Sequence, residues 1–228
     1  MLIDGQNYCL PPIMSYVLLK LSLHLKRYRI LKVIMKLSQK LLLTEPHVCP
    51  WWLAYTFDNP FRRLIHDPER IFSPYLINGM TAMDVGCGMG FFSIGMAKIV
   101  GNTGKVIAVD IQRKMLDILQ RRALKSGVGH RIHTHCATPD DIGLCPINSD
   151  KIDLALTFWM VHETPHIENF VNEIFSLVKP GGKYLLAEPR GHVSTALFHR
   201  ITATAVQAGF HVLDHPRIAL SHATWFQK

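Results

Sequence analysis

Three glycines near the middle of the chain have the spacing of a ligand-binding turn. Residues 81–92 read T-A-M-D-V-G-C-G-M-G-F-F, with Gly86, Gly88 and Gly90 at every second position after a short apolar run. Glycine permits a sharp turn and a close approach to a ligand, and a helix that begins directly afterwards offers unpaired N–H groups to a negative group. The stretch therefore predicts a ligand cradle between a strand at residues 81–85 and a helix that begins at Phe91.

An acidic residue follows at the distance expected for a ribose. Asp110 ends the apolar run K-V-I-A-V-D, twenty residues after Gly90. Ligands of open parallel sheets bind at the carboxyl ends of the strands, and an acidic residue with this spacing accepts hydrogen bonds from ribose hydroxyls. The spacing predicts an adenosine-type ligand.

Two classes of ligand compete for this turn. A nicotinamide dinucleotide requires G-x-G-x-x-G, whereas here G-x-G-x-G is followed by Phe91. Asp84 precedes the turn, where its charge repels a pyrophosphate and attracts an ammonium group. A ligand with an α-amino acid end fits better, because the backbone N–H groups can donate to its carboxylate and Asp84 can accept from its amine. S-adenosylmethionine carries such an end together with a ribose and an adenine.

Four segments carry a family resemblance: M-D-V-G-C-G-M-G, V-I-A-V-D, I-D-L-A-L-T-F-W-M-V-H-E and L-V-K-P-G-G-K-Y-L-L-A-E-P. In this order they resemble the motifs of class I S-adenosylmethionine-dependent methyltransferases, from about Met80 to the C-terminus. The chain is most similar to the small-molecule branch typified by ubiquinone/menaquinone-biosynthesis C-methyltransferases. The resemblance implies a seven-stranded sheet, with Asp84 and the glycines around the methionine end, Asp110 on the ribose, and Ile111 and Gln112 beside the adenosine.

The third motif departs from the family pattern. It commonly reads G-D-A, with the Asp on the adenine amine, whereas this chain has H-C-A at Cys136 and Ala137. Cys136 is a poor acceptor, so Asp140, Asp141 or a backbone group is expected to replace it. Cys87, inside the glycine turn, is interpreted as a small packed residue rather than a nucleophile. The expected cofactor-binding residues are Asp84, Gly86, Cys87, Gly88, Gly90, Asp110, Ile111, Gln112, Cys136, Ala137 and Phe158.

Methyl transfer requires alignment of donor and acceptor, worth ~7 to 11 kcal/mol. An acidic acceptor must also lose a proton, and a positioned base contributes ~10²- to 10⁴-fold. His162 and Glu163 follow the strand expected at residues 152–158 and are the candidate catalytic residues. The structural alternative is that they begin a helix, with Glu163 favourable to the helix dipole and His162 packed. His192, after Glu188 and Pro189, is a further candidate to face the substrate.

Strand and helix patterns alternate along residues 81–228, which we expect to form the S-adenosylmethionine-binding domain. Apolar runs predict strands at residues 81–85, 105–110, 131–135, 152–158 and 183–188, and amphipathic patterns predict helices at 91–100, 112–126, 166–178 and 194–208. Such alternation predicts a Rossmann-like α/β fold with a mostly parallel sheet and helices on both faces. The last two strand patterns, 210–216 and 218–226, are separated only by a turn and predict an antiparallel hairpin at the sheet edge.

Residues 1–44 form a basic extension. They hold five Lys and two Arg against one Asp, so they carry +6 of the net charge of +8. Within residues 13–43 a Lys/Arg face, with Arg29, Lys32, Lys36 and Lys40, lies opposite an apolar face and predicts an amphipathic helix. Such a helix binds an anionic membrane surface. The alternative is that its apolar face packs on the domain or on a partner chain.

Residues 45–80 are rich in aromatic side chains and prolines, and two short helices or turns would suit them. Trp52, Tyr55 and Phe57 are the expected lid and substrate residues, since aromatic faces attract a cation and exclude water from it. The alternative is that these side chains belong to the core.

Composition sets further limits. A chain of 228 residues that is 48% hydrophobic can form one domain with a core plus an appendage. Five cysteines without a C-x-x-C pair argue against a disulfide framework or a zinc site and indicate a reducing compartment. No apolar run reaches the ~20 residues that span a bilayer. We expect a cytoplasmic protein without metal or nucleic acid, and the sequence does not specify the oligomeric state.

The leading hypothesis is a methyltransferase that uses S-adenosylmethionine and acts on a small molecule. Two other classes stay open: a protein that binds S-adenosylmethionine without catalysis or acts as a membrane-associated assembly factor, and an NAD-dependent oxidoreductase, which Asp84 and Phe91 disfavour.

Overall fold

The computed structural model describes residues 62–144 and 152–228, and the structural statements below concern these residues. The chain divides into two units, Met1–His47 and Val48–Lys228, and the described residues belong to the second. The basic helix predicted at residues 13–43 and the lid residues Trp52, Tyr55 and Phe57 lie outside them.

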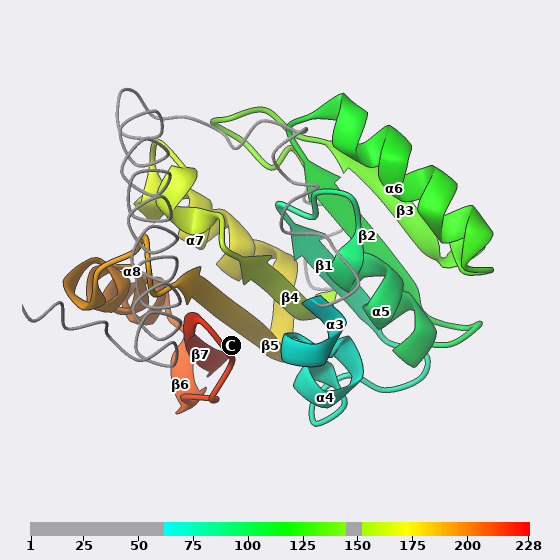
Figure 1. The fold of residues 1–228 in the computed structure, drawn as a ribbon. Coiled ribbons are helices and arrows are strands. Elements are labelled where there is room, and N and C mark those ends of the chain that lie inside the picture. The colour runs from blue at the N-terminus through cyan, green and yellow to red at the C-terminus, as the bar shows by residue number, and fades with distance from the viewer. Residues whose placement is uncertain (1–61, 145–151) are drawn as a thin grey trace, which may run out of the picture. The chain divides into compact units, whose positions relative to one another are not determined.

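The described residues form a seven-stranded sheet with the order β3-β2-β1-β4-β5-β7-β6 (Figure 1). Neighbouring strands from β3 to β5 are parallel, and β7 is antiparallel to both β5 and β6. This confirms the predicted fold class, including the C-terminal hairpin. The strands are β1 Thr81–Val85, β2 Lys105–Asp110, β3 Ile132–Cys136, β4 Ile152–Phe158, β5 Val178–Pro189, β6 His211–Asp214 and β7 Ser221–Gln227.

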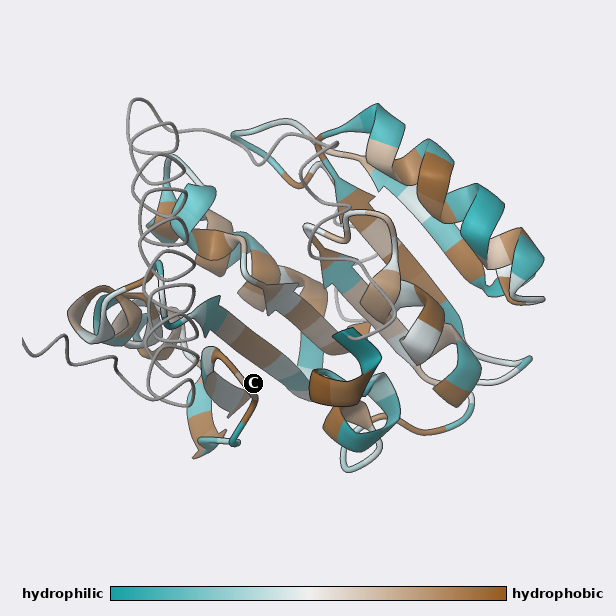
Figure 2. Ribbon diagram, in the orientation of Figure 1, coloured by the Kyte–Doolittle hydropathy of each residue, from teal (hydrophilic) through white to brown (hydrophobic). Residues whose placement is uncertain are grey.

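Helices connect β1 to β2, β2 to β3 and β4 to β5, and their apolar positions recur at helical spacing. In α6, Leu116, Leu119 and Ala123 are buried, while the charged residues of the same helix face outward (Figure 2). The α-helices are α3 Arg62–Ile65, α4 Pro68–Phe72, α5 Phe91–Ile99, α6 Arg113–Lys125, α7 Ile167–Leu177 and α8 Thr195–Gln207, with short 3₁₀ turns η1 Gly129–Arg131 and η3 Val161–Glu163.

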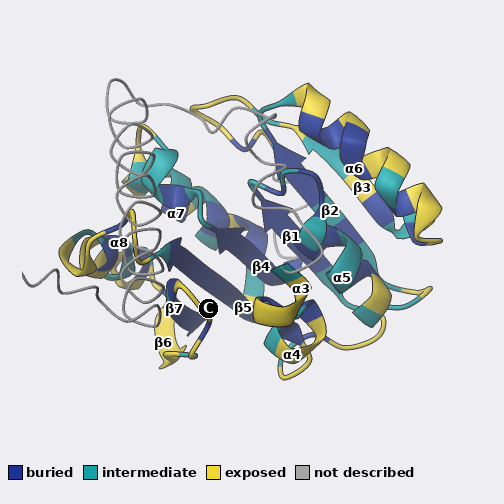
Figure 3. Ribbon diagram, viewed as in Figure 1, coloured by how far each residue is buried: buried dark blue, intermediate teal, exposed yellow. Residues whose placement is uncertain are grey.

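The sheet has a separate hydrophobic cluster on each face. Side chains alternate along β4, so Leu154, Leu156 and Phe158 join the cluster beneath α4, α5 and α6, while Ala155 joins the cluster beneath α7 and α8. Figure 3 shows the central strands buried and β6 exposed at the edge. Because both faces of the middle strands are covered, their carboxyl ends are held at fixed positions relative to one another.

β5 begins earlier than its apolar pattern predicts. Residues 179–182, which separate the helix and the strand expected from the sequence, lie within the first part of β5, and Val178 already pairs with Ile152. The N–H of Gly181 donates to the carbonyl of Lys228, and the N–H of Lys228 donates to the carbonyl of Gly182. These bonds to the end of the chain extend the strand beyond what local sequence indicates.

Residues 62–80 hold two short helices before β1. Asp67 caps α4 by accepting from the N–H of Glu69, and Pro68 occupies the first turn, where no donor is needed. Phe72 and Leu76 are buried in the cluster beneath α5 and α6. This part of the stretch expected to form a lid therefore also contributes to the core.

Candidate functional site

The glycine turn follows β1 directly and is tied to β2. The N–H groups of Gly86 and Cys87 both donate to the carbonyl of Val109, at 2.9 and 3.0 Å. Gly86, Gly88 and Gly90 have φ of 74°, 53° and 82°, in the left-handed region that favours glycine. Gly90 then starts α5 without a side-chain cap, so the first amides of this helix point out of the turn.

The three glycines differ in the space around them. A Cβ on Gly86 would lie 2.6 Å from a side-chain atom of Met160, and one on Gly90 would lie 2.5 Å from Leu119. A Cβ on Gly88 would meet no atom of residues 62–144 or 152–228 within 4 Å. Gly86 and Gly90 are thus required by internal packing, whereas the backbone at Gly88 borders open space that a ligand can enter.

Asp110 ends β2 beside this space and is almost buried, with 8% of its surface exposed. One carboxylate oxygen accepts from the N–H of Gly88 at 2.9 Å, and the other accepts from the N–H of Gln112 at 2.8 Å. Burial raises the pKa of this carboxyl above its ordinary value, while its backbone hydrogen bonds oppose the shift. Each oxygen keeps further acceptor capacity, so Asp110 can still accept from a ligand hydroxyl.

Asp84 lies beneath the turn and is more deeply buried than Asp110. Its carboxylate accepts from the Ser93 hydroxyl at 2.5 Å, in the first turn of α5. Burial raises its pKa to about 6, against the hydrogen bond from Ser93 and the positive charge of Arg62. Asp84 therefore anchors α5 in addition to the role expected toward a ligand amine, a dual use that the sequence did not indicate.

The end of β3 lies next to Asp110. The N–H of Ala137 donates to the Asp110 carbonyl at 3.1 Å, and the Cys136 thiol lies 3.7 Å from the carbonyl of Ile111. Cys87, by contrast, is buried, and burial raises its pKa well above the ordinary value, which disfavours a thiolate. The geometry brings Gly88, Asp110, Ile111, Gln112, Cys136 and Ala137 together, and their contacts with an adenosine remain predictions.

The carboxyl ends of β4 and β5 place two histidines near a buried acid. His162 lies in η3, after β4, and its Nδ1 is 2.5 Å from an oxygen of Glu188, the second-to-last residue of β5. The other Glu188 oxygen accepts from the N–H of Val161 at 2.8 Å. The ring of His192, from the loop after β5, stacks edge-on against His162 at 4.9 Å between centroids.

The two acids beside His162 increase the affinity of its ring for a proton. Burial lowers the pKa of His162, but the hydrogen bond and charge of Glu188, with the charge of Glu163, outweigh it and raise the pKa above its ordinary value. The pKa of His192 is lowered by burial and by His162. Nε2 of His162 lies 3.9 Å from Glu163, which is too long for a hydrogen bond.

Two ring side chains that the sequence analysis did not single out, Trp159 and His66, pack against Phe158. Trp159, directly after Phe158, has a φ of 62°, which strains a bulky residue, and its indole N–H donates to Ser221. His66 is fully buried, packs edge-on against Phe158 and Trp159, and has its Nε2 2.7 Å from the Ala219 carbonyl. These contacts join segments distant in sequence, so no local pattern could have revealed them.

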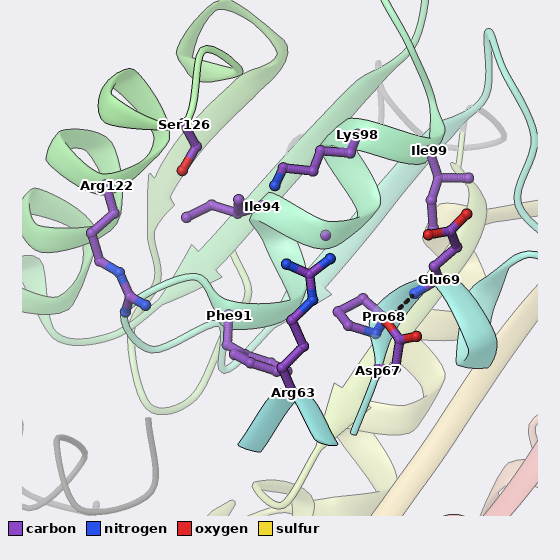
Figure 4. A pocket seen from close by; sticks show the side chains of 11 residues that line it. Arg63, Asp67, Pro68, Glu69, Phe91, Ile94, Lys98, Ile99, Arg122 and Ser126 are labelled. Atoms are coloured by element: carbon purple, nitrogen blue, oxygen red, sulfur yellow. Dashed lines mark hydrogen bonds between the residues drawn. The ribbon is translucent and has the colours of Figure 1, made fainter. Parts of the chain in front are cut away.

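A cavity of about 300 Å³ lies along the outer face of α5 (Figure 4). Phe91 and Ile94 form apolar wall, and Arg63, Lys98 and Arg122 line it with positive charge. None of the residues expected to bind cofactor or substrate lines this cavity. The cavity is therefore a different feature from the open space next to the backbone of Gly88. Among the described residues no helix is long and apolar enough to cross a membrane, and no group of three or more His, Cys, Asp and Glu could hold a metal.

Comparison with curated proteins finds relatives over part of the chain. A demethylmenaquinone methyltransferase from Oceanobacillus iheyensis is 30% identical over 110 residues, 48% of this chain and 44% of that protein. A ubiquinone/menaquinone biosynthesis C-methyltransferase from Brucella canis is 26% identical over the same length, 48% of this chain and 40% of the relative. The chain thus spans less than half the length of these relatives.

Solved structures share the fold. An S-adenosylmethionine-dependent methyltransferase from Aquifex aeolicus has a TM-score of 0.70 at 21% identity, covering 79% of this chain and 99% of that chain. Fibrillarin from Aeropyrum pernix, solved with bound S-adenosyl-L-methionine, has a TM-score of 0.55 at 15% identity and covers 68% of each chain. The family model described as a methyltransferase domain matches residues 76–224, which contain the whole sheet except the last residues of β7. The chain belongs to this methyltransferase domain family.

Proposed function

We propose that the protein is an enzyme that transfers a methyl group from S-adenosylmethionine to a small-molecule acceptor. The observation that carries this proposal is the turn at residues 86–90, which borders open space at Gly88 and is joined to the buried carboxylate of Asp110. S-adenosylmethionine supplies a methyl group on a positively charged sulfur, which becomes a neutral thioether when the methyl leaves.

The residues present fit the parts of this ligand. Asp110 has acceptor capacity for ribose hydroxyls, and the first amides of α5, with the helix dipole, suit a carboxylate. The buried charge of Asp84 favours a nearby amine. Ile111, Gln112, Ala137 and Cys136 are our candidates for contacts with the adenosine, and Phe158 for the methionine end.

His162 is the proposed proton acceptor for an acidic substrate, with Glu163 as the second candidate. Both lie in η3 beyond the carboxyl end of β4, and His162 is the better supported because Glu188 fixes its ring. His192 and the aromatic residues Trp52, Tyr55 and Phe57 are proposed to contact the acceptor, with residues 45–80 as a lid. The names of the relatives, which concern demethylmenaquinone, ubiquinone and menaquinone, supply the first compounds for an acceptor panel.

Thermal unfolding with three ligands tests the proposal. S-adenosylmethionine and S-adenosylhomocysteine at 100 times their dissociation constants should each stabilise the protein by ~2.7 kcal/mol, while NAD should not. Asp110→Ala should abolish the shift. Stabilisation by NAD alone would favour an oxidoreductase, and binding of S-adenosylmethionine without turnover on any acceptor would favour a binding protein.

We further propose that the basic amphipathic helix predicted at residues 13–43 binds an anionic membrane surface peripherally, which would place a cytoplasmic enzyme at the membrane. The support is its charge pattern: residues 1–44 carry +6, and residues 45–228 carry only +2. Lys and Arg near an anionic bilayer contribute ~1 kcal/mol each. Binding that is insensitive to salt would contradict this proposal.

A further inference from the structure

Glu188 is a fully buried acid at the end of β5 with both oxygens engaged. One oxygen accepts from the N–H of Val161 and the other contacts Nδ1 of His162. A buried carboxylate is costly unless it is paired and hydrogen-bonded. Its two partners belong to η3, the segment that follows β4, so the carboxylate fixes this segment where the substrate is expected.

This contact determines which nitrogen of His162 can accept a proton. A carboxylate only accepts hydrogen bonds, so the proton of the neutral imidazole lies on Nδ1 and the lone pair lies on Nε2. No hydrogen bond to Nε2 occurs among the residues that the structure describes, since the nearest acid oxygen, on Glu163, lies 3.9 Å away. The lone pair on Nε2 of His162 can therefore accept a proton from another molecule.

Three ionisable groups face His162 from different elements: Glu188 from β5, Glu163 from η3, and His192 from the loop after β5. The two acids raise the pKa of His162, while the pKa of His192 is lowered. Environments that separate the pKa values of neighbouring groups assign the roles of acid and base. The first proton accepted here belongs on His162, whose ring packs edge-on against the ring of exposed His192.

We propose that Glu188 is a positioning residue that holds His162 as the base of the methyl transfer, and that the acceptor consequently carries an ionisable O–H, N–H or activated C–H. This inference rests on the proposed function. Nε2 of His162 takes the acceptor's proton, and the electron pair left on the acceptor forms the bond to the methyl carbon. The electrons of the broken carbon–sulfur bond stay on sulfur, which becomes a neutral thioether.

Two-bond ¹H–¹⁵N spectra of the imidazole rings test the assignment without a substrate. In the native protein, neutral His162 should carry its proton on Nδ1. In Glu188→Gln the amide oxygen can still accept from Val161, but the amide NH₂ donates to Nδ1, so the proton should move to Nε2 and the pKa of His162 should fall. A native spectrum with the proton on Nε2 would overturn the proposal, whether or not the variant folds.

Turnover provides the second measurement. Glu188→Gln should lower kcat at least ~100-fold, the lower range for a general base, and leave KM for S-adenosylmethionine and its thermal shift unchanged. The matched control Glu168→Gln, at an exposed position in α7, should change neither. If S-adenosylmethionine stabilises the variant and kcat is unaffected, Glu188 has only a structural role and this inference fails while the proposed function stands. If no adenosyl ligand stabilises the native chain, the proposed function fails instead.

Discussion

Asp84 accepts a hydrogen bond that ties β1 to α5, but its burial disfavours the charged form of its carboxyl group. Its pKa of about 6 lies above the value of 3.8 that an exposed Asp has. The folded state therefore binds more protons than the unfolded state between these two values, and stability falls as pH rises through this window. Asp84 thus costs stability at neutral pH, which is consistent with a site that awaits a positive ligand group.

Asp84→Asn should remove this pH dependence. The amide oxygen can still accept from Ser93, while the ionisation disappears. Between pH 4 and pH 7 the native chain should therefore lose up to about 3 kcal/mol of unfolding free energy that the variant keeps. Urea unfolding from pH 4 to pH 7 measures the difference. Asp110, whose pKa is also raised, remains in both proteins, so the difference between them reports the ionisation of Asp84 together with its repulsion from Asp110. An identical slope in the two proteins would contradict this account.

The residues proposed for the cofactor and those proposed for the base differ in how far the sequence could predict their arrangement. The glycines, Asp84 and Asp110 lie in one strand–turn–helix–strand segment, so local spacing was sufficient to bring them together. Glu188 lies near the end of β5 and His162 lies in η3 after β4, so their contact depends on the register between β4 and β5. Sequence placed both at strand ends without indicating that they touch.

In the turn between β1 and α5, Gly86 is needed for packing, whereas Gly88 borders the space proposed for the ligand. Gly88→Ala should cost ~1 to 2 kcal/mol from its left-handed backbone alone and should lose most of the thermal shift with S-adenosylmethionine, because the new methyl enters the space expected for the ligand. Gly86→Ala should lose more stability, since its Cβ also collides with Met160. Gly191→Ala, which has space and an ordinary φ, is the control for both. A normal ligand shift in Gly88→Ala would mean that the ligand does not approach this turn.

The contact between α4 and α5 depends on a glycine inside a helix. A Cβ on Gly95 would lie 2.3 Å from a Pro68 side-chain atom, and both residues line the cavity along α5. Alanine gains up to ~1 kcal/mol of helix propensity, but overpacking costs ~1 to 3 kcal/mol. Gly95→Ala should therefore give a net loss of about 1 kcal/mol in urea unfolding. A stabilised variant would show that α4 can shift without cost.

For the domain as a whole, the order of strands and helices could be predicted because strand patterns and helix patterns alternate along the sequence. Parallel strands with intervening helices leave few topologies, because the crossovers are right-handed. The extended start of β5 was not predictable, since it depends on hydrogen bonds to the last residue of the chain. Similarly, the core position of Phe72 depends on α5 and α6 rather than on its own aromatic-rich segment.

The two proposed activities fall on different parts of the chain, and this makes them separable. All residues proposed for the cofactor and the base lie after residue 80, whereas the excess positive charge lies in residues 1–44. Replacing Arg29, Lys32, Lys36 and Lys40 by Gln should abolish co-sedimentation with anionic vesicles, because each charge contributes ~1 kcal/mol, and should leave the thermal shift with S-adenosylmethionine intact. A chain that begins at Met35 should behave likewise.

Replacement of Lys105, Lys114, Lys125 and Arg121 by Gln, a matched loss of charge in the folded domain, should preserve vesicle binding. If both four-residue variants lose vesicle binding equally, the binding depends on net charge alone and the proposal is wrong. Binding through the predicted helix requires that only the charges of residues 13–43 matter.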